Sequence, residues 1–429
     1  MSDLAARNGG SFGLVALALI LLLGLVLRVG EAWDGRAPVH DAAAYAEIAA
    51  NLAEGDGYTL GRGATQPASN YSPGLPLFVA ATYELTGGEH ERLVRLLLAL
   101  IGSLAVLLTY LIGRRLSGPS AGLMGAGIVA VYPALLEYQG MLMGEPFATT
   151  LLSGALLAVL WAADGARTRW LLPGLLIGAL ALIRPEYLAV GLLLALVIAL
   201  RRIRADWRGS LATGMLIAVG IVLVVAPWTL RNAIALDRLV PISTGGGQVL
   251  FAGSYVPSEG DPERVGHEVL ERHPGLLAQL PPDPRLEQIL AALAEQRYPG
   301  METDRALARM GRERLWDEVT ERPLDYVGFA AAKLWNLWGH GPRQVMEQPG
   351  WELFHWLLVA LALVGLAALI RERRWEAVPL LTVVLAITAL SLVLVASPRR
   401  VLVLLPLVAA LAAVGVTSSR DSLARRWNG

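Results

Sequence analysis

Long apolar runs occupy most of this chain of 429 residues and limit what it can fold into. Hydrophobic residues make up 55% of the sequence and charged residues 17%, which is not the composition of a water-soluble globular protein. A helix needs about 20 apolar residues to cross a bilayer, and several runs reach or approach that length. We predict an all-α polytopic membrane protein with ten spans, at 12–30, 92–113, 120–136, 146–163, 170–183, 187–200, 210–229, 352–370, 376–396 and 401–417.

Arginine clusters orient these spans, because cytoplasmic loops are enriched in Lys and Arg. The clusters lie in alternate short loops and in the tail, at 114–115, 167–169, 201–208, 371–374 and 420–426. All of them are cytoplasmic only if the apolar segments Pro73–Thr86 and Tyr326–Trp338 do not cross. Each would form a helix of about 20 Å, shorter than the hydrocarbon core of about 30 Å. We expect both to be juxtamembrane or re-entrant helices on the outer side.

The same topology predicts three regions. Residues 1–231 form an N-terminal transmembrane module whose first outer loop is 31–91. Residues 232–325 form a small, mainly helical extracytoplasmic cap, with amphipathic patterns at 264–272, 285–297 and 303–320. Residues 326–429 return to a juxtamembrane helix and transmembrane helices. Most of the polar chain therefore lies on the outer side, which favours a substrate found there.

Composition also excludes several classes of function. The formal net charge is zero, so we expect no nucleic-acid partner. The chain has no cysteine, which excludes disulfides and thiolate catalysis. The six histidines show no metal-ligand spacing, and Gly245–Gly247 lacks the Lys-Ser/Thr of a phosphate-binding loop and is predicted to be a flexible loop. We expect no metal and no cofactor.

Two carboxylates are candidates for catalysis. Asp41 starts a helical pattern in the first outer loop, where it is either a helix N-cap or a general base; the two roles are compatible. Glu145 stands before Pro146 at the outer end of a span. It is either a first-turn acid favoured by the helix dipole or a functional carboxylate, since an ionisable group near a membrane helix is costly to bury.

Several arginines lie where the positive-inside rule predicts few. Arg184 and Glu186 flank Pro185 in an apolar run; they either pair in a turn, or Arg184 faces a cavity and holds an anion. Arg231, Arg399 and Arg400 lie at outer helix ends, where snorkelling is the alternative. Because a guanidinium binds phosphate bidentately, these arginines favour an anionic, lipid-linked substrate.

Several stretches together carry a family resemblance: D-A-A-A-Y-A-E-I-A-A-N-L-A-E-G-D-G-Y (41–58), N-Y-S-P-G-L-P-L-F (70–78), the arginine-containing pieces within 92–118, A-P-W-T-L-R-N (226–232), P-I-S-T-G-G-G (241–247) and P-R-R-V-L-V-L-L-P (398–406). In this order the chain resembles GT-C membrane glycosyltransferases, the group that contains protein O-mannosyltransferases and lipid A aminoarabinose transferases. His40-Asp41-Ala42 has one acid where the mannosyltransferases have two. Ser72 stands where the aminoarabinose transferases carry a lysine, so the phosphate would be held by arginines.

The resemblance implies a GT-C fold and a hexosyl- or pentosyltransferase that moves a sugar from a polyprenyl-phosphate donor to a hydroxyl of a glycan, lipid or protein acceptor. The reaction would be inverting and metal-independent, with Asp41 as the base, at the outer face of a bacterial plasma membrane. We assign Glu145 to the catalytic site and the binding of substrate to Tyr45, Tyr71, Arg184, Glu186, Arg231, Arg399 and Arg400. The rival hypotheses are a flippase for a lipid-linked sugar, with the Arg184-Pro185 break lining its path, and a non-catalytic scaffold.

The orientation is open to a direct test. Alkaline phosphatase fused at Gly61, or within 255–300, should be active because those positions are predicted to lie outside the membrane. Fusions at Gly118, Ala166 and Ala205 should be inactive. An inactive fusion in the 255–300 segment would overturn the predicted sidedness.

Overall fold

The computed structural model describes residues 2–61, 63–201, 203–259, 261 and 263–427. Over these residues the chain is helical, and its only β-type pairing is an isolated bridge between Thr59 and Pro67. It forms two compact units. The membrane unit comprises Met1–Ile242, Gln344–Val384 and Leu402–Gly429, and the insert unit comprises Ser243–Arg343 and Leu385–Val401.

The membrane unit contains the predicted spans. Its helices are α1 (Ser2–Trp33), α2 (Asp41–Glu54), α3 (Gly74–Thr86), α4 (Glu91–Val131), α5 (Pro133–Glu137), α6 (Glu145–Ala162), α7 (Leu171–Ile183), α8 (Glu186–Arg201), α9 (Trp207–Leu236) and α15 (Pro349–Arg371). Helices α16 (Ala377–Val393) and α17 (Arg399–Trp427) contribute to both units.

The membrane class is confirmed. Among the described residues, six helices are long and apolar enough to cross a bilayer, and Ala377–Val393 is a shorter apolar helix. Each of the ten predicted spans falls on a helix, and the two short segments at Pro73–Thr86 and Tyr326–Trp338 correspond to α3 and α14 (Pro323–Trp338). The number of crossings remains a prediction.

Helix α4 is two antiparallel helices, as the separate spans 92–113 and 120–136 predict. The helical dihedrals break at Ser117 (φ −150°, ψ 27°) and Gly118 (φ 84°, ψ −179°), just before Pro119. The two arms pack closely: a Cβ at Gly113 would lie 2.9 Å from the Ala121 carbonyl oxygen, and one at Gly122 2.6 Å from the Tyr110 oxygen. The second arm ends at Val131 rather than 136, because Tyr132 is extended and Pro133 starts α5.

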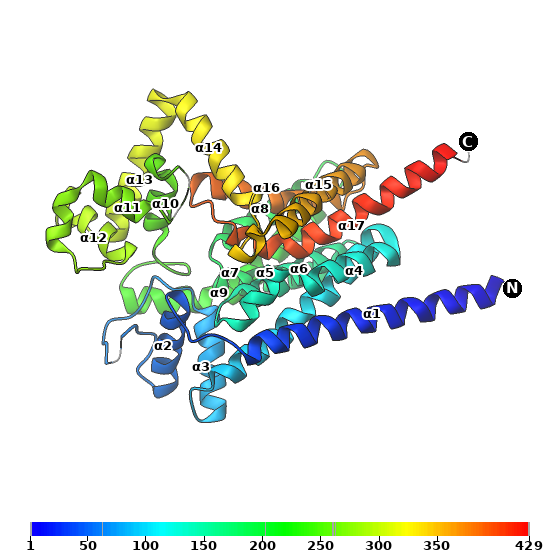
Figure 1. Cartoon of the computed structure of the whole chain (residues 1–429), viewed down its shortest axis with the longest axis horizontal. Helices are drawn as coiled ribbons and strands as arrows, with labels where there is room; N and C mark the ends of the chain where they lie inside the picture. Colours follow the sequence, from blue (N-terminus) through cyan, green and yellow to red (C-terminus); the bar gives the residue numbers. More distant parts are fainter. Residues whose placement is uncertain (1, 62, 202, 260, 262, 428–429) are drawn as a thin grey trace. The chain divides into compact units, whose positions relative to one another are not determined.

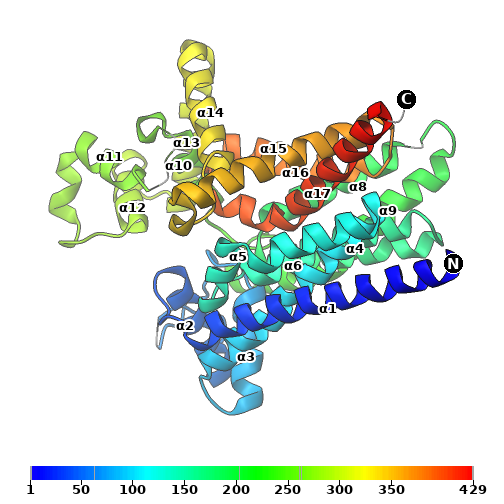
Figure 2. The same cartoon turned by 45° about the vertical axis from the view of Figure 1, so that its right-hand side comes forward.

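Helix α1 runs beside α4, and α2 and α3 follow at the C-terminal end of α1 (Figures 1 and 2). The pair is joined by Arg28, which is 1% exposed. Its guanidinium donates to the carbonyl oxygens of Val129 (2.8 Å) and Ala130 (3.2 Å), in the last turn of α4. These carbonyls have no intrahelical partner, so Arg28 satisfies them and fixes the end of α1 from which the first loop departs.

The insert unit contains α10 (Gly246–Ser254), α11 (Val265–Arg272), α12 (Leu286–Arg297), α13 (Thr303–Glu321) and α14. The patterns at 264–272, 285–297 and 303–320 are helices, as predicted. The loop prediction for Gly245–Gly247 is wrong: α10 begins there, because Gly245 adopts φ 96° and the Asp304 carboxylate accepts hydrogen bonds from the Gly247 and Gln248 backbone N–H groups. The helices share an apolar core that includes Phe251, Val265, Leu290 and Leu307.

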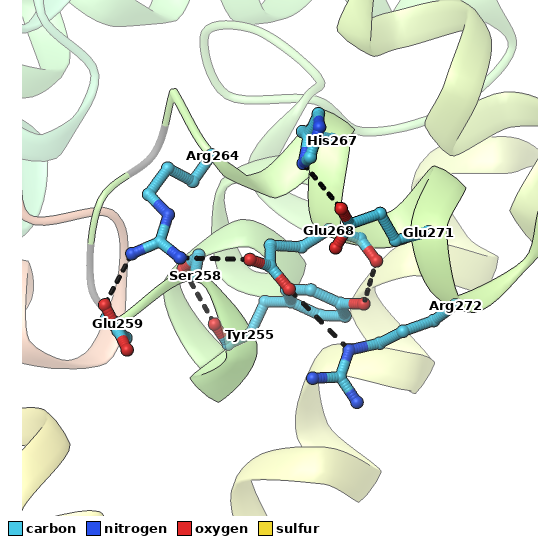
Figure 3. Close-up of polar contacts among 8 residues, drawn as sticks. All are labelled: Tyr255, Ser258, Glu259, Arg264, His267, Glu268, Glu271 and Arg272. Atoms are coloured by element: carbon cyan, nitrogen blue, oxygen red, sulfur yellow. Dashed lines mark hydrogen bonds and ion pairs between the residues drawn. The ribbon is translucent and has the colours of Figure 1, made fainter.

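Polar contacts hold α11 against the segment after α10 (Figure 3). Arg264 lies between two carboxylates, with Nη1 at 2.5 Å from Glu259 and Nη2 at 3.1 Å from Glu268. The Tyr255 hydroxyl donates to the Glu268 carbonyl oxygen at 3.4 Å, and Arg272 faces the Glu268 carboxylate at 3.8 Å. These contacts place the Tyr255 ring on the inner side of α11.

Lys333 joins three segments of the insert unit. It is 1% exposed, and its ammonium donates to the carbonyl oxygens of Gly253 (2.7 Å) and Leu392 (2.5 Å), near the C-terminal ends of α10 and α16. Both oxygens lie at the negative end of a helix dipole. Burial, and next the charge of Arg400, lower the pKa of Lys333 to about 7.

This pKa predicts a pH dependence of stability. Between about pH 7 and pH 10 the unfolded chain binds a proton at Lys333 that the folded chain has released, so Lys333 makes the free energy of unfolding rise with pH. Lys333→Met should lose that rise, while Arg305→Gln, at an exposed position of the same unit, should keep it. Thermal unfolding in detergent from pH 6.5 to 9.5 measures the difference. Parallel curves for wild type and Lys333→Met would contradict the prediction.

Candidate active site

Asp41 is the first residue of α2. His40 occupies the N-cap position with φ 50°, so the N-cap interpretation of Asp41 is wrong. The carboxylate lies in the first turn, where the helix dipole favours a negative charge. The loop that leads to it is anchored by a hydrogen bond from the Arg36 backbone N–H to the Gly140 carbonyl oxygen (3.0 Å).

The first loop folds around its own small core of Ile48, Tyr58 and Ala68. Tyr45 lies one turn after Asp41 on the same face of α2, and its ring meets that of Tyr71 edge-on with centroids 5.5 Å apart. The Tyr58 hydroxyl donates to the Tyr71 carbonyl oxygen at 3.0 Å. The structure therefore brings together the two predicted tyrosines, Tyr45 in α2 and Tyr71 in the irregular segment before α3.

Arg231 packs against Tyr58, a member of this core. It is inside α9, which continues to Leu236, rather than beyond the end of a span at 229. Its guanidinium lies over the rings of Trp228 (4.9 Å) and Tyr58 (5.3 Å) and donates to the Tyr58 carbonyl oxygen at 3.3 Å and the Asn232 side-chain oxygen at 3.1 Å. Asn232 is held in turn by the carbonyl oxygens of Val240 and Ile242. Arg231 is half-buried and fixed in orientation, and its remaining N–H groups can donate to an anion.

Glu145 and Arg184 form a buried ion pair between Arg184 Nη2 and Glu145 Oε1. The Glu145 side chain is 1% exposed and that of Arg184 17%. Arg184 ends α7 in an extended conformation, and Glu186 starts α8. The structure thus pairs Arg184 with the other candidate carboxylate across 39 residues of chain.

Close glycine contacts bring α3 to the same place. A Cβ at Gly74, the first residue of α3, would lie 2.6 Å from the Ile183 side chain. A Cβ at Gly144, just before α6, would lie 2.7 Å from the other branch of that side chain. The starts of α3 and α6 and the end of α7 therefore meet at Ile183, beside the ion pair.

A small cavity adjoins Glu145. Its lining includes Arg28, Gln139 and Thr149, all at most 2% exposed. Within the described part of the chain, Gln139 Oε1 and Arg28 Nε have no hydrogen-bond partner. The sequence pattern does not predict a role for these three residues, nor for Tyr58 and Trp228. Arg28 was visible as a charge at the end of the first span, and Trp228 in A-P-W-T-L-R-N.

Arg399 and Arg400 begin α17 in the insert unit. The Arg399 backbone N–H and an Arg400 guanidinium N–H contact the hydroxyls of Ser397 and Ser391, each at 3.4 Å. Their grouping with Asp41 remains a proposal. Over the residues that the structure describes, no group of three or more His, Asp or Glu side chains could hold a metal ion.

Comparison with known proteins identifies the fold. The family model described as dolichyl-phosphate-mannose-protein mannosyltransferase matches residues 69–229. The archaeal oligosaccharyltransferase AglB from Archaeoglobus fulgidus, in complex with an inhibitory peptide and a dolichol-phosphate, superposes with a TM-score of 0.58 over 96% of this chain at 15% identity. The apo oligosaccharyltransferase of the same organism gives 0.57 over 97% at 15% identity.

These alignments cover 51% and 52% of the two oligosaccharyltransferase chains, so this chain spans about half their length. ArnT from Cupriavidus metallidurans bound to undecaprenyl phosphate superposes more loosely, with a TM-score of 0.44 at 15% identity over 94% of this chain and 77% of that one. No curated protein matches. The chain has the GT-C fold of membrane glycosyltransferases, as the family resemblance implied.

The buried ion pair predicts a stability effect. Arg184→Ala should lower the free energy of unfolding by about 3–5 kcal/mol, because it leaves the Glu145 carboxylate buried without this partner. The double variant Glu145→Ala/Arg184→Ala should be more stable than Arg184→Ala alone. Denaturant unfolding in detergent measures both. If the double variant lowers the free energy of unfolding by the sum of the effects of Glu145→Ala and Arg184→Ala measured singly, the two residues are not coupled and the prediction is wrong.

Proposed function

We propose that the chain transfers a sugar from a polyprenyl-phosphate donor to an acceptor hydroxyl, with inversion, at the extracytoplasmic face of a bacterial plasma membrane. The observation that carries the proposal is the packing of the first loop, in which the helix that starts with Asp41 and the guanidinium of Arg231 share one core through Tyr58. The fold shared with AglB, whose structure contains dolichol-phosphate and a peptide, supports a lipid-linked donor.

Asp41 is the proposed base. Its carboxylate takes the proton of the acceptor hydroxyl while that oxygen attacks the anomeric carbon of the donor sugar. The bond between the anomeric carbon and the phosphate oxygen breaks, and polyprenyl phosphate leaves from the opposite face with the bonding electron pair. The helix dipole favours a negative charge in the first turn of α2, and a general base acts as the carboxylate.

The arginines are proposed to stabilise the leaving phosphate. Arg231 is held over Tyr58 and Trp228 before any substrate binds, so it needs little reorganisation as charge develops on the phosphate. Arg399 and Arg400 are assigned to the same phosphate. Negative charge on the phosphate grows towards the transition state, so the arginines bind the phosphate more strongly there than in the bound donor. The activation barrier falls by the difference between these two binding energies.

Glu145 and Arg184 are assigned to positioning. Their ion pair orients the Arg184 guanidinium, and the contacts of Gly74 and Gly144 with Ile183 place the pair beside the start of α3. Tyr45 and Tyr71 are proposed to contact the sugar beside Asp41, and Glu186 to bind a sugar hydroxyl from the start of α8. The acceptor is a glycan, lipid or protein hydroxyl.

Asp41→Asn tests the base. The variant should accumulate in membranes and bind donor, but transfer should fall by about 10²–10⁴-fold because an amide cannot accept the proton. Glu145→Gln should show a smaller loss, and Glu54→Gln at the exposed end of α2 should keep full activity. Transfer of label from a panel of radiolabelled polyprenyl-phosphate sugars by the purified chain measures the rates.

Three results would change the assignment. Near wild-type transfer by Asp41→Asn together with an inactive Glu145→Gln would make Glu145 the base. Full activity in both variants would remove both carboxylates from the chemistry. Movement of intact donor across liposomes without release of polyprenyl phosphate would favour the flippase instead.

A further inference from the structure

The second half of α13 presents a charged face to a cavity. Glu313, Arg314, Asp317, Glu318 and Glu321 recur at positions i, i+1, i+4, i+5 and i+8, so they lie on one face of the helix, and all of them line a cavity. On the other side, Trp316 is 70% exposed and Val319 44%. Glu313, Asp317 and Glu321 are exposed, whereas Arg314 and Glu318 are partly buried in the cavity wall. The charged face is therefore open to a ligand that enters the cavity.

The cavity lies in the insert unit, between this face of α13 and the end of α12. Its volume is about 620 Å³, within the range of small-molecule sites. Leu293 and Met310 supply its apolar lining, and His273, Gln296, Arg297 and Arg322 complete its wall. It is lined predominantly by groups that donate or accept hydrogen bonds.

Several of these groups are already fixed in place. The Arg314 guanidinium lies over the rings of Tyr255 (4.5 Å) and Phe251 (5.4 Å), and the Tyr255 hydroxyl is itself bound to α11 (Figure 3). The Glu313 carboxylate accepts from the Tyr298 hydroxyl at 2.6 Å and from Arg309 Nε at 2.8 Å. A site whose side chains are ordered in advance loses less entropy when it binds a ligand.

One acceptor in the cavity wall is not satisfied. Oε2 of Glu318 is buried and has no hydrogen-bond partner within the described residues, while Oε1 lies 4.0 Å from Arg322 Nη1. A buried acceptor without a donor costs free energy, so a ligand hydroxyl that donates to it would gain.

The charges of the cavity indicate the class of ligand. Arg297, Arg314 and Arg322 balance Asp317, Glu318 and Glu321, since Glu313 is offset by Arg309 outside the lining. A strongly anionic or cationic ligand would meet like charges in this wall. A neutral ligand rich in hydroxyls suits it, because each hydroxyl donates to a carboxylate and accepts from a guanidinium.

We propose that the cavity between α12 and α13 binds a neutral oligosaccharide. This inference rests on the proposed function: the cavity is the subsite that recognises the acceptor. Of the three acceptor classes, glycan, lipid and protein, it selects the glycan. The sugar hydroxyls pair with Asp317, Glu318 and the three arginines, and the apolar face of a ring packs on Leu293 and Met310.

Saturation-transfer NMR on the full chain in lipid nanodiscs tests the proposal with mannotriose, maltotriose and chitotriose as probes. At least one should receive saturation from the wild type. Asp317→Asn and Arg297→Gln should weaken its binding tenfold or more. The matched controls Glu287→Gln on α12 and Arg305→Gln on α13 lie at exposed positions outside the cavity and should bind as wild type does.

The outcomes separate this inference from the proposed function, because the measurement needs neither donor nor transfer. Binding that is lost only in the cavity variants supports the inference even if no sugar transfer is ever detected. No binding of any of the three trisaccharides would overturn it, as would binding that the cavity and control variants weaken equally. Binding of inorganic phosphate in place of the sugars, lost in Arg297→Gln, would also overturn it.

Discussion

Hydrocarbon offers no hydrogen bonds to a backbone, and the membrane unit is built around that constraint. Each apolar run is helical because a helix satisfies its own peptide groups, so unsatisfied groups occur only where a helix ends. Arg28 shows the consequence. A buried guanidinium between α1 and α4 is tolerated because it completes the last carbonyls of α4, and in doing so it fixes the point from which the first loop leaves.

The candidate active site is assembled from helix ends for the same reason. Asp41 starts α2, Glu145 starts α6 and Arg184 ends α7, so each charged group lies where a helix dipole or an ion pair can stabilise it. Side chains in the middle of a lipid-facing span could not carry these charges at low cost. The glycines at positions 74 and 144 let three helix ends approach Ile183, which a larger residue at either position would prevent.

The insert unit shows a different balance between stability and recognition. Its core is apolar, but α13 places charged side chains on an open cavity and leaves Trp316 exposed. Lys333 is a buried ionisable group in this unit, and it is held by carbonyl oxygens at two helix ends. A buried ionisable group lowers stability unless it is paired, so Lys333 is better explained by the three segments that it joins than by packing alone.

Local patterns predicted the helices well. The apolar runs, the division between the spans 92–113 and 120–136, and the amphipathic stretches at 264–272, 285–297 and 303–320 all correspond to observed elements, because each depends on neighbours within a few residues. The start of α10 was missed because its cap, Asp304, lies 57 residues further along the chain. Asp41 was placed at a helix start, but its position as first helical residue rather than N-cap depends on the unusual backbone of His40.

What the sequence determined by itself was the membrane class, the resemblance to GT-C glycosyltransferases and the identity of the outlying carboxylates and arginines. Composition and the length of the apolar runs carry the membrane class, whereas the resemblance rests on the order of motifs such as those at 41–58, 226–232 and 398–406. Only the tertiary structure decided the partners: Arg184 with Glu145, Arg231 with Tyr58 and Trp228, Tyr45 with Tyr71, and the charged face of α13 with a cavity. These pairings join segments that are dozens of residues apart, and the packing of helices selects them through contacts that no local pattern records.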